Sequence, residues 1–419
     1  MNFALLEGSF AMKFLARQPI LDRRQEVYAY ELLFRDGIQD NCDGMNLEFA
    51  STSVLDTSFL IGLDKITEGR RMFVNCPREF LLRGYVSLFP RDAVVVEILE
   101  TVKPDEEIVE ACQLLKQDGF LIALDDFVDT PDWAPLVELA DFIKVDFRLT
   151  GREQQRTLAA RYARKGIRML AEKVETQEEF AAAVKMGYSL FQGYFFCKPE
   201  IMQHQSLPAF KLAYLELLQA ATAPEIDIGQ LATQIKHDAS ITFRLLRYLN
   251  SAAFGLRSEI HSIPHALSLL GEREMRKWIA VVAVGVMADG RPGELMTVPL
   301  VRGRFCELLA PLAGLPQHAN DLFLLGLLSV MDAILGQPLE AILGELPVRQ
   351  EIKEALLART GLYRNLLDIA IAHENADWEK VNSLLELLGV SKELVPVLYV
   401  SALNWSSALH RGIHEHAIG

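Results

Sequence analysis

Residues 119–130 read GFLIALDDFVDT, in which an apolar run of strand length ends at two adjacent aspartates, Asp125 and Asp126. Up to about residue 200, similar short runs alternate with stretches of helical periodicity. This alternation predicts β-α units, and eight strands are the number that a closed parallel (β/α)8 barrel requires. The eight runs are FLARQPIL (14–21), EVYAYELLF (26–34), RRMFVNC (70–76), AVVVEIL (93–99), FLIALDD (120–126), DFIKVDF (141–147), IRMLAEK (167–173) and SLFQGYFF (189–196).

Polar residues stand at or just past the predicted C-terminal ends of these runs. In a barrel of this kind the strand ends converge on one face, so residues far apart in sequence can line one pocket. Carboxylates gathered in one pocket repel each other unless protons or cations neutralise them. Carboxylate and amide oxygens suit Mg²⁺ or Mn²⁺, and two such ions about 4 Å apart can activate water for phosphodiester hydrolysis. The residues are Glu31, Asn75, Glu97, Asp125, Asp126, Lys144, Asp146, Glu172, Glu175 and Gln192.

Composition narrows the class of protein. The 419 residues are half hydrophobic, which predicts more than one globular domain. A formal net charge of -14 argues against a broad surface for nucleic-acid polymers. The five scattered cysteines favour free thiols in a reducing compartment. No signal peptide precedes the first strand, and the longest apolar run (279–288) is about half a membrane span. We therefore expect a cytoplasmic protein that is not inserted in a membrane.

The pattern changes near residue 205. From there on, apolar residues recur at three- and four-residue spacings, and no strand-rich stretch is evident. The segment KPEIMQHQSLPAF (198–210) interrupts both patterns. We therefore predict a barrel domain over residues 1–200 and an all-helical domain over residues 201–419.

The first domain resembles the EAL family, phosphodiesterases of the bacterial second messenger cyclic di-GMP. Seven motifs occur in the family's order, which makes the resemblance specific, and together they cover about residues 13 to 200. They are RQPILDRRQEVYAYELLFR, FVNCP, VVVEILE, IALDDF, IKVDF, LAEKVET and FQGYFFCKP.

The resemblance implies roles for individual residues. Five residues are implied to be ligands of two Mg²⁺ or Mn²⁺ ions, namely Glu31, Asn75, Glu97, Asp125 and Asp126. Catalytic roles are implied for Lys144, Glu172 and Gln192, which would arrange or activate the attacking water, and for Glu175, which would support the loop after Asp126. The candidate ligand-binding residues are Gln18, Arg35, Asp146 and Pro199. The implied reaction opens cyclic di-GMP to the linear dinucleotide.

Four positions depart from the family's pattern. Leu32 replaces the alanine of the family name, which predicts a bulkier pocket wall, and Leu99 replaces a threonine. Val128 lies in a loop that usually contains glycine, which valine cannot imitate in its backbone angles. Lys173 replaces a glycine and either competes with a cation for the carboxylates or points out of the pocket. Changes in the residues that orient metal ligands commonly lower activity without abolishing binding, even when the ligands themselves are present.

The second domain resembles HDOD domains, helical relatives of the HD metal-dependent phosphohydrolases. The motifs are HDASITFRLLRYLNSAAFG, IHSIPHALSLLG and FLLGLLSVMD. Ser329 and Val330 occupy the positions where the active relatives carry a His-Asp pair of metal ligands, and neither side chain can replace those ligands. The pair His237-Asp238 lies where HDOD sequences commonly have only the aspartate. This domain is therefore expected to be a catalytically silent module that binds protein partners.

The two resemblances together cover nearly the whole chain and leave three functions open. The first is a regulator that binds cyclic di-GMP, hydrolyses it weakly and presents the helical domain to protein partners. The second is a fully active phosphodiesterase, and the third is a scaffold that has lost its ligand. Pairing of two barrels into a homodimer is compatible with all three.

Overall fold

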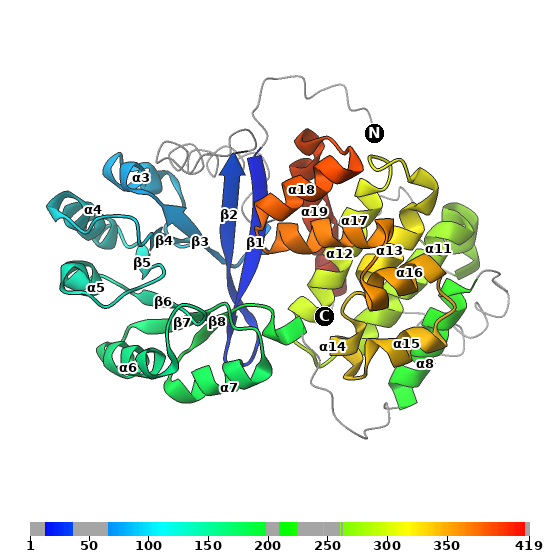
Figure 1. Ribbon diagram of the computed structural model, residues 1–419, viewed down its shortest axis with the longest axis horizontal. Helices are drawn as coiled ribbons and strands as arrows, with labels where there is room; N and C mark the ends of the chain where they lie inside the picture. Colours follow the sequence, from blue (N-terminus) through cyan, green and yellow to red (C-terminus); the bar gives the residue numbers. More distant parts are fainter. Residues whose placement is uncertain are drawn as a thin grey trace.

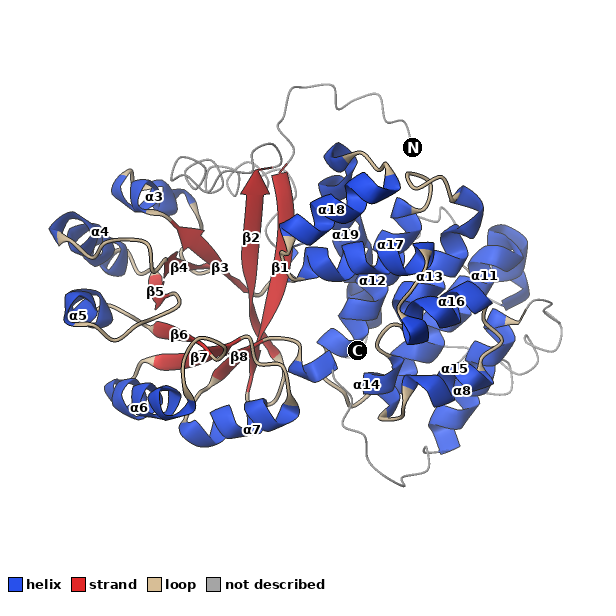
Figure 2. Cartoon of the chain, viewed as in Figure 1, coloured by secondary structure: helices blue, strands red, loops and turns tan. Residues whose placement is uncertain are grey.

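The computed structural model describes residues 13–36, 66–197, 209–223 and 263–414, together with positions 246 and 260. A β barrel surrounded by helices lies beside a body of helices (Figure 1). Within the described residues, strands occur in the barrel alone (Figure 2). These observations confirm the predicted combination of a (β/α)8-type barrel with an all-helical region. The predicted boundary between residues 200 and 201 lies outside the described residues and stays a prediction.

Eight strands close the barrel in chain order. Each overlaps one of the eight apolar runs, because those runs are long enough for a strand and are largely buried. The strands are β1 (Lys13–Asp22), β2 (Val27–Asp36), β3 (Arg71–Cys76), β4 (Val94–Ile98), β5 (Leu121–Leu124), β6 (Phe142–Asp146), β7 (Arg168–Glu172) and β8 (Leu190–Gln192).

The first strand departs from an all-parallel barrel, because β1 runs antiparallel to both β2 and β8. Only residues 23–26 join β1 to β2, and the turn is held by Asp22, whose Oδ1 accepts hydrogen bonds from the backbone N–H groups of Arg24 (2.8 Å) and Glu26 (3.0 Å). A parallel neighbour would need a crossover of a dozen or more residues. The short connection therefore reverses the direction of β1.

Alternation along the strands fixes which side chains face the barrel interior. One buried cluster fills the interior near the N-terminal ends of the strands and contains Ile20, Ala29, Phe73, Val95, Ala123, Phe142, Leu170 and Leu190. Two residues further along β4, β6 and β7, the same face carries Glu97, Lys144 and Glu172. The apolar floor therefore places the polar residues at the C-terminal rim.

Helices cover the outside of the barrel, and two of them begin with a side-chain cap. Asp105 accepts a hydrogen bond from the N–H of Ile108 at the start of α4, and Thr176 accepts one from Glu179 at the start of α7. The barrel helices are α3 (Arg78–Leu82), α4 (Glu106–Gln117), α5 (Ala134–Val137), α6 (Arg152–Tyr162) and α7 (Gln177–Met186), with short turns η1 (Tyr85–Leu88), η2 (Pro131–Trp133), η3 (Ala163–Lys165) and η4 (Phe195–Cys197).

The helical body is built around α12, which lies against α13 and α19. Its helices are α8 (Ala209–Thr222), α11 (Ile263–Met287), α12 (Glu294–Leu309), α13 (Ala319–Leu328), α14 (Met331–Leu335), α15 (Leu339–Glu345), α16 (Gln350–Lys353), α17 (Leu362–Glu374), α18 (Trp378–Leu388) and α19 (Val395–His414). Shorter turns are η5 (Pro316–His318), η6 (Glu354–Ala358) and η7 (Lys392–Leu394).

The two parts meet along β1, which contacts α17 and α19 (Figure 1). Tyr30 on β2 donates its hydroxyl hydrogen to Glu294 Oε1 on α12 at 2.8 Å. Arg17 on β1 lies over the ring of Tyr30, 4.2 Å from its centroid. These buried contacts hold the helical body against the rim side of the barrel.

Among the helices in the described part of the chain, none is long and apolar enough to cross a lipid bilayer.

Candidate active site

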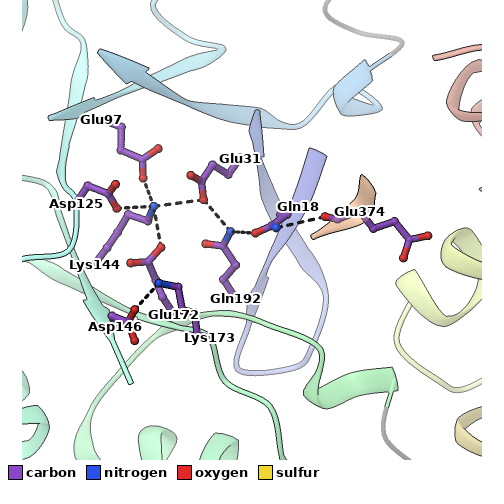
Figure 3. Close-up of polar contacts among 10 residues, drawn as sticks. All are labelled: Gln18, Glu31, Glu97, Asp125, Lys144, Asp146, Glu172, Lys173, Gln192 and Glu374. Carbon is purple, nitrogen blue, oxygen red and sulfur yellow. Dashed lines mark hydrogen bonds and ion pairs between the residues drawn. The ribbon is translucent and has the colours of Figure 1, made fainter. Parts of the chain in front are cut away.

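Lys144 stands at the centre of the polar rim. Its Nζ lies 2.8 Å from Asp125 Oδ1, 2.9 Å from Glu172 Oε1 and 3.3 Å from Glu31 Oε2 (Figure 3). It also forms an ion pair with Glu97, which is fully buried beneath it. We call Lys144 and these four carboxyl groups the Lys144 cluster. It brings together residues from β2, β4, β6 and β7 and from the end of β5, as the sequence predicts.

Burial and mutual repulsion set the protonation of the Lys144 cluster. Burial raises the pKa of Glu97 well above its usual value, and Glu31 raises it further. Burial likewise raises the pKa of Glu172 to about 8, against the lowering effect of Lys144. Burial alone would lower the pKa of Lys144, but the surrounding carboxylates outweigh it and hold that pKa well above its usual range. One ammonium therefore faces an excess of carboxyl groups that it cannot neutralise.

A chain of hydrogen bonds leads from the cluster to the helical body (Figure 3). Gln192 Nε2 donates to Glu31 Oε2 at 2.7 Å and to Gln18 Oε1 at 2.8 Å. Gln18 Nε2 in turn donates to the main-chain oxygen of Glu374, at the end of α17, at 3.2 Å. The register of β1 and β2 places Gln18 directly opposite Glu31. The amide of Gln18 is therefore oriented by both domains.

A cavity of about 450 Å³ opens above the cluster. Among its lining residues are nine that the sequence singles out: Gln18, Glu31, Asn75, Asp125, Asp126, Lys144, Glu172, Glu175 and Gln192. Two buried oxygens in this set have no hydrogen-bond partner, namely Asp126 Oδ1 and Gln192 Oε1. Unpartnered buried acceptors are uncommon, and these two oxygens are free to accept a hydrogen bond.

The two adjacent aspartates take different positions. Asp125 reaches Lys144, whereas Asp126 adopts a backbone φ of 39°, which is rare for a residue with a side chain. Burial and the charge of Asp125 raise the pKa of Asp126. The turn at Asp126 therefore lets both carboxyl groups line one cavity, which the extended strand could not do because successive side chains point to opposite faces.

The donor set suits hard divalent cations in its chemistry, since it consists of carboxyl and amide oxygens. Within the described residues, however, no group of three or more His, Cys, Asp or Glu side chains is arranged to hold a metal ion. The ammonium of Lys144 lies where the carboxylates converge. Cations would be held by Glu31, Asp125, Asp126 and their neighbours only after the carboxylates reorganise around them.

Asp146, a predicted ligand-binding residue, lies outside the cavity. Its Oδ1 accepts hydrogen bonds from the backbone N–H groups of Arg148 (2.6 Å) and Leu149 (3.1 Å). Its other oxygen pairs with Lys173. Although burial opposes the effect, these contacts lower the pKa of Asp146. Its position is that of a residue that holds the turn after β6.

The backbone φ of Lys173 is 54°, in the region that glycine adopts most easily. This angle explains why a glycine is usual at this position in the family. The side chain of Lys173 is more than half exposed and pairs with Asp146 at the cavity rim, so it neither joins the Lys144 cluster nor points fully away. Lys173 nonetheless adds a positive charge near Asp126. Glu175, also at the rim, pairs with Arg148 at 3.2 Å.

The prediction that Leu32 thickens the pocket wall is wrong. Leu32 is buried in the core between the strands and the outer helices, and the next residue, Leu33, lines the cavity instead. Alternation along β2 explains this, since Glu31 faces inward. Leu99 is also buried in that outer core, and Val128 is exposed.

Some predicted residues lie outside the described part. Pro199 and the pair His237-Asp238 are not among the described residues, and neither is the side chain of Arg35, although its backbone lies on β2.

Three residues, Tyr194, Arg302 and Glu374, were not found by sequence reasoning. Tyr194 follows β8 and donates its hydroxyl hydrogen to Glu374 Oε2 at 3.2 Å. Arg302 on α12 donates to both carboxylate oxygens of Glu374, at 2.8 to 3.0 Å, and to Ser329 Oγ at 3.1 Å. We call Arg302, Glu374 and Ser329 the Arg302 centre. No local pattern marks Glu374, because its barrel partners are more than 170 residues away.

Comparisons with known proteins agree with this architecture. The family described as "EAL domain" matches residues 80–199, and the family described as "HDOD domain" matches residues 207–338. The uncharacterized protein YuxH of Bacillus subtilis is 34% identical over 401 residues, which cover 94% of this chain and 97% of YuxH. The cyclic di-GMP phosphodiesterase CdgJ of Vibrio cholerae is 33% identical over 411 residues, which cover 97% of this chain and 95% of CdgJ.

Solved structures resemble the barrel. The Klebsiella pneumoniae protein BlrP1, in a calcium and cyclic di-GMP complex, aligns with a TM-score of 0.38 and 22% identity over 45% of this chain and 55% of its own. A standalone EAL protein from Vibrio cholerae in its c-di-GMP bound form aligns with a TM-score of 0.34 and 26% identity, over 45% of this chain and 93% of its own.

Proposed function

Because the chain belongs to the family of proteins that join an EAL domain to an HDOD domain, we propose that its barrel binds cyclic di-GMP and opens it to the linear dinucleotide with the help of divalent cations. The observation that carries the proposal is the Lys144 cluster, in which one ammonium faces four carboxyl groups beneath a cavity. The similarity of nearly the whole chain to the cyclic di-GMP phosphodiesterase CdgJ supports the choice of substrate.

The excess of carboxyl groups accounts for the dependence on cations. Bound Mg²⁺ or Mn²⁺ would polarise the phosphate and lower the pKa of a water molecule. Glu31, Asp125 and Asp126, with Asn75 and Glu97 beside them, are the residues that would hold the ions. The negative charges of the substrate's phosphates also require these ions, because carboxyl groups outnumber the ammonium in the Lys144 cluster.

The residues of the chain divide the remaining tasks. Glu172 lines the cavity and would accept a proton from the attacking water. Lys144 offers its ammonium to the negative charge that develops on the phosphate oxygens. Gln192 holds Glu31 through Nε2 and keeps Oε1 available to orient a water molecule or the substrate.

The altered rim favours slow turnover. Lys173 pairs with Asp146 beside Asp126, so a fixed positive charge stands where a cation would approach. Exposed Val128 follows in the loop that usually contains glycine. Binding without turnover is therefore the second candidate function.

The proposal extends to the rest of the protein. In the helical domain Arg302 pairs with Glu374, and within the described residues no group of acidic, His or Cys side chains is arranged to hold a metal. The proposed role of this domain is therefore to bind protein partners and not to catalyse a metal-dependent reaction. The cytoplasm is the proposed location, which the four free thiols of Cys76, Cys112, Cys197 and Cys306 support. The proposed oligomeric state is a homodimer in which two barrels pair. Measurement of the mass in solution tests it.

Two measurements test the function. Incubation of the full chain with cyclic di-GMP and Mn²⁺, followed by chromatography, should yield the linear dinucleotide. Calorimetric titration in Ca²⁺, where turnover is expected to be suppressed, should show saturable binding. Glu31→Gln should lose both signals, whereas Glu138→Gln, at an exposed position outside the cavity, should keep both. Binding without product would support the second candidate, and no binding in any cation would refute the proposal.

A further inference from the structure

The cavity above the Lys144 cluster does not end with the barrel. It continues past β1 into the helical body, where residues of α12, the end of α17 and α19 complete its lining. These residues include Val298, Val301, Asn375, Tyr399 and Leu403, and we call this surface the helical wall. The barrel therefore provides only part of the cavity that a ligand would enter.

The chemistry of the cavity changes along its length. Its barrel end carries the carboxyl groups and the ammonium of the Lys144 cluster. Toward the helical wall the lining is mixed: Val298 and Val301 face the same cavity as the rings of Tyr194 and Phe196, and the polar Glu294, Thr297 and Glu374 line it beside them. The rings of Tyr194 and Phe196 are nearly parallel, with centroids 6.2 Å apart. Flat apolar surfaces of this kind suit an aromatic ring system.

From this division, which rests on the proposed function, we infer that a bound cyclic dinucleotide lies between the two domains. Its phosphates face the Lys144 cluster, and one of its guanine bases lies against the helical wall. Nucleobases stack on aromatic side chains and fill apolar pockets, whereas phosphates need cations. The reverse orientation would place a base among the carboxylates, where it would displace the cations on which phosphate binding depends.

The contacts between the domains fix the distance from the cluster to the wall. Gln18 donates to the main-chain oxygen of Glu374, which belongs to the last turn of α17, where such oxygens lack a partner within the helix. The carboxylate of Glu374 is held by Arg302 and by Tyr194. The helical wall is therefore anchored to the same glutamine that reaches Gln192 and Glu31. Its residues determine which base fits, so they are specificity-determining residues from the second domain.

Substitutions in the helical wall test this inference in the full chain. Val298→Phe adds a ring from α12, and Asn375→Trp adds one from the exposed end of α17. Calorimetry with cyclic di-GMP in Ca²⁺ should show affinity at least about tenfold weaker for each. The control Ser383→Trp places the same indole on the exposed face of α18, outside the cavity, and should bind as the natural sequence does. Mn²⁺ affinity should stay unchanged in all three, because none touches the carboxylates.

A second measurement does not depend on how the variants fold. Cyclic di-GMP carrying an 8-azido group on its bases, irradiated while bound, should label peptides that contain residues 294–303 or 374–375. The inference is overturned if the natural chain binds cyclic di-GMP, both wall variants bind equally well, and labelling is confined to barrel peptides. If the natural chain binds no cyclic di-GMP in any cation, the proposed function fails and the inference fails with it.

Discussion

Each half of the molecule buries a basic side chain among polar groups, but the balance of charge differs between them. In the barrel, Lys144 faces the carboxyl groups of Glu31, Glu97, Asp125 and Glu172. In the helical body, the guanidinium of Arg302 meets a single carboxylate, that of Glu374, in a bidentate pair.

On the proposed function, this difference separates a site that would bind cations from one that would not. Ser329, at a position where the resemblance places a metal ligand of active relatives, accepts a hydrogen bond from Arg302 instead. The charges of the Arg302 centre cancel, so nothing attracts a dication. The Lys144 cluster keeps an excess of carboxyl groups, and its burial strengthens their attraction for cations.

Removal of the basic side chain from each centre should have the largest effect. Lys144→Met and Arg302→Met should each lower the free energy of unfolding by about 3–5 kcal/mol, because each leaves buried carboxyl groups without a counter-ion. Saturating Ca²⁺ should restore stability to Lys144→Met alone. Thermal melts with and without Ca²⁺ measure both effects, and rescue of Arg302→Met by Ca²⁺ would break the comparison.

Two glycines support the two centres and should be nearly as sensitive. A Cβ atom at Gly193 would lie 2.0 Å from the main-chain oxygen of Val174, and one at Gly326 would lie 2.4 Å from the main-chain nitrogen of Gly303. Alanine at either position should lower the free energy of unfolding by about 1–3 kcal/mol. Gly193→Ala should also weaken nucleotide binding, because Gly193 follows Gln192, whereas Gly326→Ala should not.

The matched control for these glycines is Gly344→Ala. A Cβ atom at Gly344 meets nothing within 4 Å, and the residue lies inside a helix, so alanine should leave stability unchanged or slightly raised. Equal loss of stability in all three variants would show that the close contacts at Gly193 and Gly326 are not the cause.

Glu172 in the Lys144 cluster should contribute to the dependence of stability on pH. The pKa of Glu172 rises from 4.5 to about 8 on folding, chiefly through burial. At this residue the folded state therefore binds more protons than the unfolded state between those values, so the contribution of Glu172 to stability is fully present below pH 4.5 and is lost as pH rises through 8. Denaturation at a series of pH values without divalent cations should show this decline, and Glu172→Gln should flatten it. A slope that survives in Glu172→Gln would place its source elsewhere.

The smallest effect is expected from Lys173→Gly. Glycine relieves the positive φ and removes a mostly exposed positive charge near Asp126. Mn²⁺ affinity, measured by calorimetry, should rise about two- to fivefold, in line with the modest energy of exposed ion pairs. Lys165→Gly removes an exposed lysine that pairs with Glu138 instead and should leave the affinity unchanged. Unaltered affinity in Lys173→Gly would mean that Lys173 does not compete with cations.

Much of the barrel could be predicted from local sequence. Apolar runs such as residues 120–124 end in polar residues because the strands are buried along their length and open at one rim. The reversed direction of β1 was not predicted, although the four-residue connection after Asp22 carries the signal. Leu32 follows Glu31 on β2, so the two side chains point to opposite faces of the strand. The position of Leu32 outside the pocket could therefore be predicted from alternation alone.

The contacts between the halves could not be predicted in this way. Gln18 and Glu374 are 356 residues apart, and their hydrogen bond uses a main-chain oxygen, which leaves no trace in residue type. The convergence of carboxyl groups was foreseeable from strand ends, but the central position of Lys144 among them depends on side-chain packing within the closed barrel.

The most direct test of the charge comparison is the location of Mn²⁺ by anomalous X-ray scattering in crystals of the full chain. The account predicts manganese peaks beside Asp125 and Asp126 in the Lys144 cluster and none at the Arg302 centre. A peak between Arg302 and Glu374, or a Lys144 cluster that stays free of manganese at saturating concentration, would contradict it.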